Sequence, residues 1–157
     1  MLNLIDWQTH YRSLEQMYSQ APINRFFQPR LSISKGFAEL TMEVREDFHH
    51  AAGAAHGSVY FKAVDDSAFF AANSLVPDCF VLTSSITLFF LRPIQSGTLI
   101  AKGTVVQNSK NLIIAESNLF DERGREIGRG IGSFAKSQIL LTPEIGYRMP
   151  IDERKEQ

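Results

Sequence analysis

The chain has 157 residues, of which 44% are hydrophobic and 21% are charged. These values are ordinary for one folded domain, which we expect over residues 1–157, and a chain of this length can bury a core without disulfides. The formal net charge of −1 gives no reason to expect binding to nucleic acid or to an anionic membrane, although local basic patches stay open.

Cys79 is the single cysteine, so no internal disulfide can form, which fits a reducing compartment. Its apolar neighbours Phe80 and Val81 favour a buried strand residue over a catalytic nucleophile. The N-terminus lacks the basic region of a signal peptide, and no run approaches the ~20 apolar residues of a membrane span. We therefore expect a soluble, cytoplasmic protein.

The first predicted element is an amphipathic helix over about residues 3–20. Asn3 is its expected cap, Asp6 suits the helix dipole, and Pro22 follows its end. We expect its apolar stripe to pack on its own domain or on a second copy of the chain, rather than to recognise another partner. That stripe has spacings of three and four: Leu4, Trp7, Tyr11, Leu14 and Tyr18.

Two strands are predicted next, over residues 31–35 and 38–44, with Gly36 at a turn or bulge between them. A loop rich in His, Ala and Gly follows over residues 45–57. Residues 58–73 are apolar around most of a helical circumference, which is typical of a helix buried in a core.

After the helix, the chain becomes β-prone. Hairpin turn signals at residues 108–111 and 121–124 make the expected sheet antiparallel, and one buried helix against such a sheet is an α+β layer. We expect the polar tail from about residue 143 to be loosely ordered. The predicted strands are residues 79–91, 98–107, 112–120 and 126–137.

Three glycines, Gly128, Gly130 and Gly132, lie on one face of the last predicted strand. Glycine weakens a strand, so their alignment predicts close approach by another element. The buried helix is the obvious candidate.

The buried helix carries two adjacent acids, Asp65 and Asp66, which need partners or a function because burying a charge is costly. Lys62 can pair with Asp66 at i, i+4, whereas neighbours on a helix point about 100° apart. Asp65 is then the unexplained acid, and from helix logic alone a structural and a functional role stay equally open.

The turn that leads into this helix, residues 53–58, contains small residues that leave backbone N–H groups open. A helix N-terminus of this kind can polarise a thioester carbonyl and hold an oxyanion. By itself the turn is also compatible with an ordinary start of a helix.

His56-Gly57-Ser58, with Asp65 nine residues after His56, resembles the HGG…D signature of hotdog-fold acyl-CoA thioesterases, in particular the phenylacetyl-CoA thioesterase-like (PaaI-like) branch. The similarity continues through Pro93-x-x-x-Gly97 and the Gly-rich last strand, over roughly residues 30–138. It implies a hotdog fold, in which an antiparallel sheet wraps around one central helix, and hydrolysis of an acyl- or aryl-CoA thioester.

The resemblance also implies roles at the matched positions. Asp65 would be the general base or the direct nucleophile, and the backbone N–H of Gly57 would polarise the thioester carbonyl. His50 stands where the family commonly has an Asn that places substrate or water. Thr83 falls where a hydroxyl orients the water, with Ser84 as the fallback.

Two of these positions depart from the family pattern. Ser58 replaces the usual second glycine, which is expected to narrow the site, and His50 adds a titratable group, so activity is expected to fall at mildly acidic pH. His56 and Ser58, which flank Gly57, complete the substrate-binding candidates together with Ser84.

The spacing of Gly57 and Asp65 argues for a dimer. Eight residues correspond to roughly 12 Å along a helix, whereas a general base acts within about 3 Å or through one water. An antiparallel partner helix could bring Asp65 of one chain near Gly57 of the other. The resemblance likewise implies a homodimer with sites at its interface; a dimer of dimers stays open.

Other chemistry is less favoured. The spacing of His49, His50 and His56 fits no standard metal-ligand pattern, and no nucleophile elbow is present, so we expect no metal and no cofactor. The serious alternative is a hotdog protein that binds acyl-CoA without hydrolysing it, against which the carboxylate of Asp65 argues.

The sequence leaves the acyl group unidentified. Four phenylalanines could line an acyl or aryl pocket, although core packing is the favoured use for most of them: Phe61, Phe69, Phe89 and Phe90. Five basic residues could meet the CoA phosphates or simply be solvated: Arg92, Lys110, Arg123, Arg125 and Arg129.

Overall fold

A computed structural model describes residues 5–150 of the chain. Its elements, in chain order, are helix α1 (Trp7–Gln20), helix α2 (Asn24–Phe27), strands β1 (Arg30–Ser34) and β2 (Phe37–Val44), the 3₁₀ turn η1 (Glu46–Phe48), helix α3 (Gly57–Asn73), strands β3 (Cys79–Phe90), β4 (Gly97–Asn108), β5 (Leu112–Phe120) and β6 (Glu126–Leu140), and the 3₁₀ turn η2 (Pro143–Ile145).

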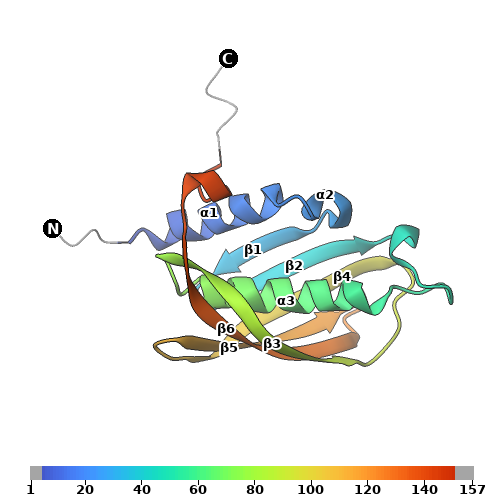
Figure 1. Cartoon of the computed structure of the whole chain (residues 1–157). Coiled ribbons are helices and arrows are strands. Elements are labelled where there is room, and N and C mark those ends of the chain that lie inside the picture. Colours follow the sequence, from blue (N-terminus) through green and yellow to red (C-terminus); the bar gives the residue numbers. More distant parts are fainter. Residues whose placement is uncertain (1–4, 151–157) are drawn as a thin grey trace, which may run out of the picture.

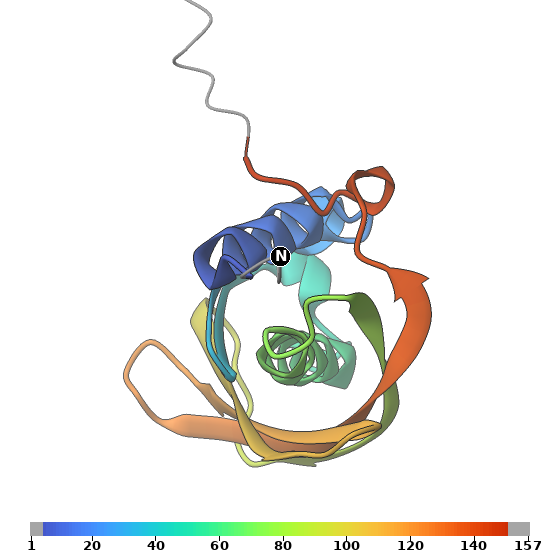
Figure 2. The ribbon, with the colours of Figure 1, turned by 90° about the vertical axis from the view of Figure 1, so that its left-hand side faces the viewer.

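All six strands form one antiparallel sheet in the order β1-β2-β4-β5-β6-β3. The sheet curls around α3, and α1 lies across the open side of the curl (Figures 1 and 2). This is the α+β hotdog arrangement expected from the resemblance. In the part of the chain that the structure describes, no helix is long and apolar enough to cross a membrane.

The close contact between α3 and the sheet explains two of the glycines in the strands. A Cβ on Gly103 would lie 2.1 Å from the backbone oxygen of Ser67, and one on Gly130 would lie 2.6 Å from the Val64 side chain. The buried hydroxyls of Ser67 and Ser117 also meet at 2.7 Å, which adds a polar contact between helix and sheet.

The prediction that the buried helix approaches the three glycines of the last strand is therefore correct for two of them. Gly128 and Gly130 face α3, but a Cβ on Gly132 would meet Ile86 and Phe134 of the sheet instead. The closest approach, at Gly103, has no sequence signal, because no other glycine lies near it on the same face of β4.

Two further expectations differ from the structure near the ends of the described chain: the cap of the first helix, and the loose order of the tail over residues 142–147. Asp6 caps α1 by accepting from the N–H of Gln8 and Thr9, so the helix begins at Trp7, while Asn3 lies outside the described residues. The tail is also ordered over residues 142–147 and packs beside α1 (Figure 1). The Tyr147 hydroxyl lies 2.7 Å from Nδ1 of His10, and both side chains need that polar partner because they are largely removed from water.

Gly103→Ala is expected to lower the free energy of unfolding by about 1–3 kcal/mol, because α3 must shift to accept the added methyl group. Urea unfolding followed by circular dichroism measures this change. The matched control is Thr104→Ala, at the exposed neighbouring position, which should stay within about 0.5 kcal/mol of the original protein. Equal stability of both variants would contradict the tight contact at Gly103.

Candidate active site

The N-terminus of α3 presents one free backbone donor. His56 is the N-cap: its Nδ1 accepts the N–H of Ser58 at 3.1 Å, and its carbonyl accepts the N–H of Val59 at 2.9 Å. Within residues 5–150 the N–H of Gly57 has no such acceptor. Because the positive end of the helix dipole also lies here, this N–H is suited to bind a carbonyl oxygen that gains negative charge.

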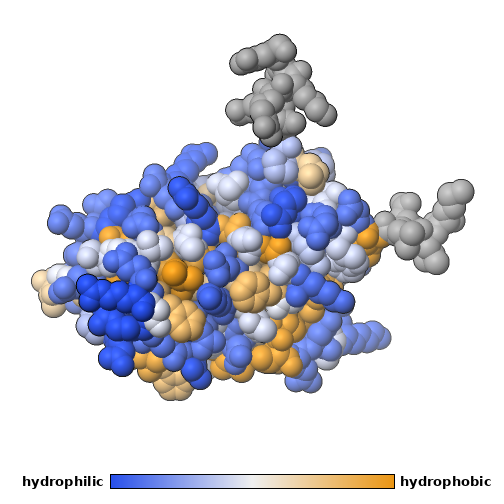
Figure 3. Space-filling model, turned by 180° about the vertical axis from the view of Figure 1, so that it is seen from behind, coloured by the Kyte–Doolittle hydropathy of each residue, from blue (hydrophilic) through white to orange (hydrophobic). Residues whose placement is uncertain are grey.

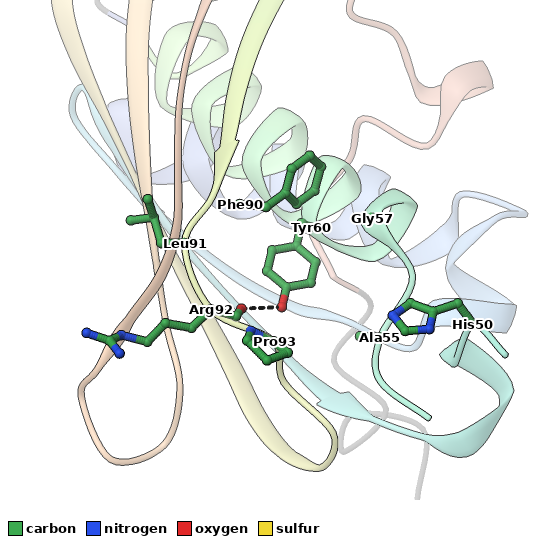
Figure 4. Close-up of a pocket in the computed structure, with 8 residues that line it drawn as sticks. All are labelled: His50, Ala55, Gly57, Tyr60, Phe90, Leu91, Arg92 and Pro93. Atoms are coloured by element: carbon green, nitrogen blue, oxygen red, sulfur yellow. Dashed lines mark hydrogen bonds between the residues drawn. The ribbon is translucent and has the colours of Figure 1, made fainter. Parts of the chain in front are cut away.

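Gly57 opens onto a pocket of about 400 Å³ (Figure 4). The Tyr60 hydroxyl donates to the Arg92 carbonyl at 2.6 Å and fixes one wall. A Cβ on Gly57 would lie 3.1 Å from the Phe90 ring, so a larger residue would crowd that ring. The other lining residues are His50, Ala55, Leu91 and Pro93.

His50 lies in this pocket as the resemblance implies (Figure 4). Its Nδ1 accepts the N–H of Ala52 at 3.1 Å, so in the neutral ring the proton is on Nε2, which can donate as an asparagine amide would. Ser58 does not line this pocket, and its hydroxyl lies 2.9 Å from Nδ1 of His56. That Ser58 narrows the site stays a prediction.

Asp65 lies two turns further along α3, where Thr83 of β3 holds it. The Thr83 hydroxyl donates to Oδ1 of Asp65 at 2.8 Å. Ser84, the fallback, occupies an irregularity in β3 between Thr83 and Ser85 and makes no hydrogen bond of this kind within the described chain. Thr83 is therefore the hydroxyl residue at the carboxylate.

The pKa of Asp65 is raised above its ordinary value, chiefly because burial penalises the charged form. The hydrogen bond from Thr83 opposes this shift, the charge of Asp66 adds to it, and the charge of Lys62 lowers it. A carboxylate with a raised pKa is a better proton acceptor than an exposed aspartate.

The neighbouring acid, Asp66, is fully paired. Lys62 lies 2.6 Å from its Oδ2, which confirms the predicted i, i+4 pair, and the Tyr18 hydroxyl of α1 donates to the same oxygen. Burial, followed by the charge of Asp66, raises the pKa of Tyr18, which therefore stays protonated as a donor. This pairing leaves Asp65 as the acid available for chemistry.

Asp65 and Gly57 line different pockets. Asp65 borders a cavity of about 290 Å³ that shares no lining residue with the pocket at Gly57. The two groups are separated by eight residues of continuous helix, or roughly 12 Å of helix axis. A single chain therefore does not bring the donor and the carboxylate to one reacting carbon.

An apolar surface adjoins both groups. Phe61, at 44% exposed, lies on α3 midway between Gly57 and Asp65, four residues from each. Strand β3 is an edge of the sheet, and its Phe89 and Phe90 are each 60% exposed. The prediction that most of the four phenylalanines pack in the core is therefore wrong, because three of them are exposed. Phe69 is the buried one of the four, and it borders the Asp65 cavity.

Hydrophobic side chains are also exposed elsewhere. The face opposite to that of Figure 1 is mixed, with hydrophobic groups gathered mainly in its lower half (Figure 3). Free apolar area beside an unpaired strand edge is typical of a surface that binds another chain.

The remaining candidates from the sequence, the cysteine and the metal-ligating histidines, have structural contacts instead. Cys79 is buried at the start of β3, which confirms the strand interpretation. His49 bonds through Nε2 to the Gln95 carbonyl at 2.8 Å. Among residues 5–150, no group of three or more His, Cys, Asp or Glu side chains is placed to hold a metal ion.

Sequence reasoning missed two contributions to these pockets. Tyr60 lies in the apolar pattern of α3, and its hydroxyl was the only signal that it also needs a polar partner. The end of α1 and the start of α2 border the Asp65 cavity through residues that carry no motif: Met17, Tyr18, Ala21, Ile23 and Asn24.

Comparison with known proteins gives relatives that are named as esterases. Residues 52–127 match the Thioesterase superfamily. A protein of Saccharolobus solfataricus named as an esterase is 24% identical over 125 residues, which cover 78% of this chain and 89% of that protein. A protein of Sulfurisphaera tokodaii, also named as an esterase, is 27% identical over 101 residues, covering 64% of this chain and 74% of the relative.

Solved structures show the same fold. The E. coli PaaI protein of the phenylacetic acid degradation operon superimposes with a TM-score of 0.79 at 21% identity, covering 86% of this chain and 98% of PaaI. A thioesterase of Haemophilus influenzae superimposes with a TM-score of 0.71 at 17% identity, covering 76% and 85% of the two chains.

The resemblance read from the sequence is thereby supported: the chain has the hotdog fold, as PaaI does, and its residues 52–127 match the Thioesterase superfamily. Its relatives are named as esterases and thioesterases, which supports hydrolysis of thioesters or esters in general.

Asp65→Asn is expected to unfold at a temperature equal to or above that of the original protein at pH 7. The folded state raises the pKa of Asp65, so ionisation of this group opposes folding. The penalty is absent below the unfolded pKa of about 3.9 and complete once the pH exceeds the folded pKa. In thermal melts, the difference in unfolding temperature between Asp65→Asn and the original protein should therefore grow from about pH 3.5 to about pH 7.

The matched control is Asp66→Asn, which breaks the ion pair with Lys62 and should cost about 1–3 kcal/mol at pH 7. A lower melting temperature for Asp65→Asn than for Asp66→Asn would contradict the assignment of Asp65 as the strained, unpaired acid.

Proposed function

We propose that the protein hydrolyses an acyl- or aryl-CoA thioester to the free acid and CoA, at a site shared by two copies of the chain. The observation that carries the proposal is the Asp65 carboxylate: partly buried, hydrogen-bonded by Thr83, and without a basic partner within 4 Å in the described residues. A charge held at such cost at the wall of a cavity is typical of a catalytic group.

In the proposed reaction, Asp65 takes a proton from water as the water oxygen attacks the thioester carbon. The N–H of Gly57 of the partner subunit stabilises the negative charge on the carbonyl oxygen. The C–S bond then breaks, and the proton held by Asp65 passes to the sulfur, which leaves as the CoA thiol. Direct attack by the Asp65 carboxylate, followed by hydrolysis of the anhydride, would use the same two groups.

The remaining site residues have supporting roles in this proposal. Thr83 orients the carboxylate, and the Nε2–H of His50 of the partner subunit places the substrate or the water. His56 acts indirectly: its ring accepts the N–H of Ser58 and so caps the helix. This cap fixes the position of the Gly57 N–H, which is proposed to bind the carbonyl oxygen. Neither the Ser58 nor the Ser84 hydroxyl forms a hydrogen bond to Asp65 in the described chain. Both residues stay predicted substrate contacts.

The shared site follows from the separation of Gly57 and Asp65 and from the exposed surface between them. A second copy that docks antiparallel on α3 and on the β3 edge would cover Phe61 and Phe89 and bring the two groups together. A homodimer is thus the proposed minimal unit, and a dimer of dimers is compatible with it. A cytoplasmic location stays a prediction.

Two of the five basic candidates for the CoA phosphates are engaged within the chain. Arg125 lies 2.7 Å from Asp121, and Arg129 lies 2.8 Å from Glu126. Arg92 has its backbone at the Gly57 pocket, while its guanidinium points away (Figure 4). Arg92, Lys110 and Arg123 are therefore the preferred phosphate contacts.

The purified protein is expected to release free thiol from at least one member of a panel of acyl- and aryl-CoA thioesters. Asp65→Asn should reduce kcat by about 10²–10⁴-fold, because Asn keeps the shape and cannot accept the proton. The control is Asp47→Asn, which removes an exposed carboxylate that borders neither pocket and should leave kcat unchanged. No turnover, with tight binding of CoA esters by all three proteins, would favour the non-catalytic acyl-CoA-binding alternative.

A mixed dimer tests the shared site directly. Gly57→Pro removes the N–H and adds ring carbons beside Phe90, which must give slightly. Proline is favoured at the first helical position, and His56 before it already has the extended backbone that proline requires (φ −61°, ψ 149°). Alone, it should lose about 10²–10³-fold in kcat.

Heterodimers of Gly57→Pro and Asp65→Asn chains, isolated through two different affinity tags, should recover about half of the original activity, since one of the two sites is then intact. Heterodimers as inactive as either parent would show that each site lies within one chain.

A further inference from the structure

The cavity beside Asp65 is built partly by a segment that precedes the part of the chain matched by the family, residues 52–127. Five residues from the end of α1 to the start of α2 form one wall: Met17, Tyr18, Ala21, Ile23 and Asn24. The facing walls come from α3 and β3, with Asp65 and Thr83 among apolar side chains such as Phe69 and Leu82.

The chemistry of this cavity suits an apolar group attached to a reacting carbonyl. Its walls are mainly aliphatic and aromatic, and Lys62 and Asp66 neutralise each other. Asp65, with its donor Thr83, is the polar centre that remains. Pockets for small molecules commonly combine such apolar walls with a few polar groups that fix orientation.

The wall formed by α1 and α2 is held firmly. The Tyr18 hydroxyl bonds to Asp66, and its ring packs at 5.0 Å on Phe70 of α3. The Asn24 side chain, 6% exposed, donates through Nδ2 to the Tyr18 carbonyl at 2.7 Å, while its Oδ1 is buried without a partner in the described residues. A wall fixed in this way limits the size of what the cavity accepts.

Ile23 lies at the outer rim of the same wall. It borders the cavity but is 58% exposed, in contrast to the buried Met17 and Tyr18. A group that extends beyond the cavity must therefore pass this side chain.

We propose that residues 17–24 select the acyl group of the substrate, with Ile23 as the residue that sets its maximum length. The proposal rests on the proposed function. A cavity of about 290 Å³ holds about ten groups of the size of a water molecule, near 30 Å³ each. The site thus takes aryl or short acyl groups of up to about ten non-hydrogen atoms.

Binding measured apart from turnover tests the proposal. In the Asp65→Asn background, calorimetry compares CoA with its acetyl, benzoyl, octanoyl and palmitoyl thioesters, and a thiol assay of the original chain runs alongside. Affinity should rise from CoA to the benzoyl and octanoyl thioesters and fall for palmitoyl-CoA.

Substitution of Ile23 should move this limit in both directions. Ile23→Trp should weaken octanoyl-CoA relative to acetyl-CoA by about tenfold, and Ile23→Ala should strengthen palmitoyl-CoA relative to octanoyl-CoA. Because Ile23 is exposed, neither change threatens the fold. The control is Val106→Trp, an exposed branched residue of β4 at neither pocket, which should leave the order of affinities unchanged.

The outcomes separate the two proposals. An order of affinities that neither Ile23 variant alters, or that shows no dependence on acyl size, overturns the role of residues 17–24. Size-dependent binding that follows Ile23, with no thiol release from the original chain, supports the selecting wall and overturns hydrolysis instead.

Discussion

The close contact of α3 with the sheet is the constraint on which the rest of the structure depends. At Gly103 the strand backbone touches the helix backbone, so only a residue without a side chain fits there. This contact, with the Ser67–Ser117 hydrogen bond, fixes the rotation of α3. The direction of the other side chains of α3 is then determined: Phe61 is exposed, and Asp65 meets Thr83 at the β3 edge of the sheet.

The same helix keeps the two candidate groups apart. Its rigid rise places the free N–H of Gly57 and the carboxylate of Asp65 in separate pockets, so neither group completes a site within one chain. The exposed phenylalanines on α3 and on the β3 edge lie beside this gap. The proposed association of two chains would cover the exposed apolar area and would complete the proposed site.

Much of the fold and of the site could be predicted from local patterns. The hairpin turns predicted antiparallel pairing of the strands. The i, i+4 spacing of Lys62 and Asp66 left Asp65 as the acid without a basic partner. What failed depends on distant contacts. An apolar side chain has the same signature in a core and at an interface, which explains the error at Phe61. The stripe of α1 predicts packing, but not that the packing borders the cavity at Asp65.

The ordered tail has a consequence for the synthesis of the protein. Gly146 lies within 3.4 Å of Met17, measured from the position its Cβ would take, and Tyr147 bonds to His10, so residues near both ends of the described chain clasp each other over α1. On the ribosome, a nascent chain that has already enclosed α3 in most of its sheet still lacks this clasp. The wall beside Asp65 therefore gains this additional support only after residues 142–147 have been made.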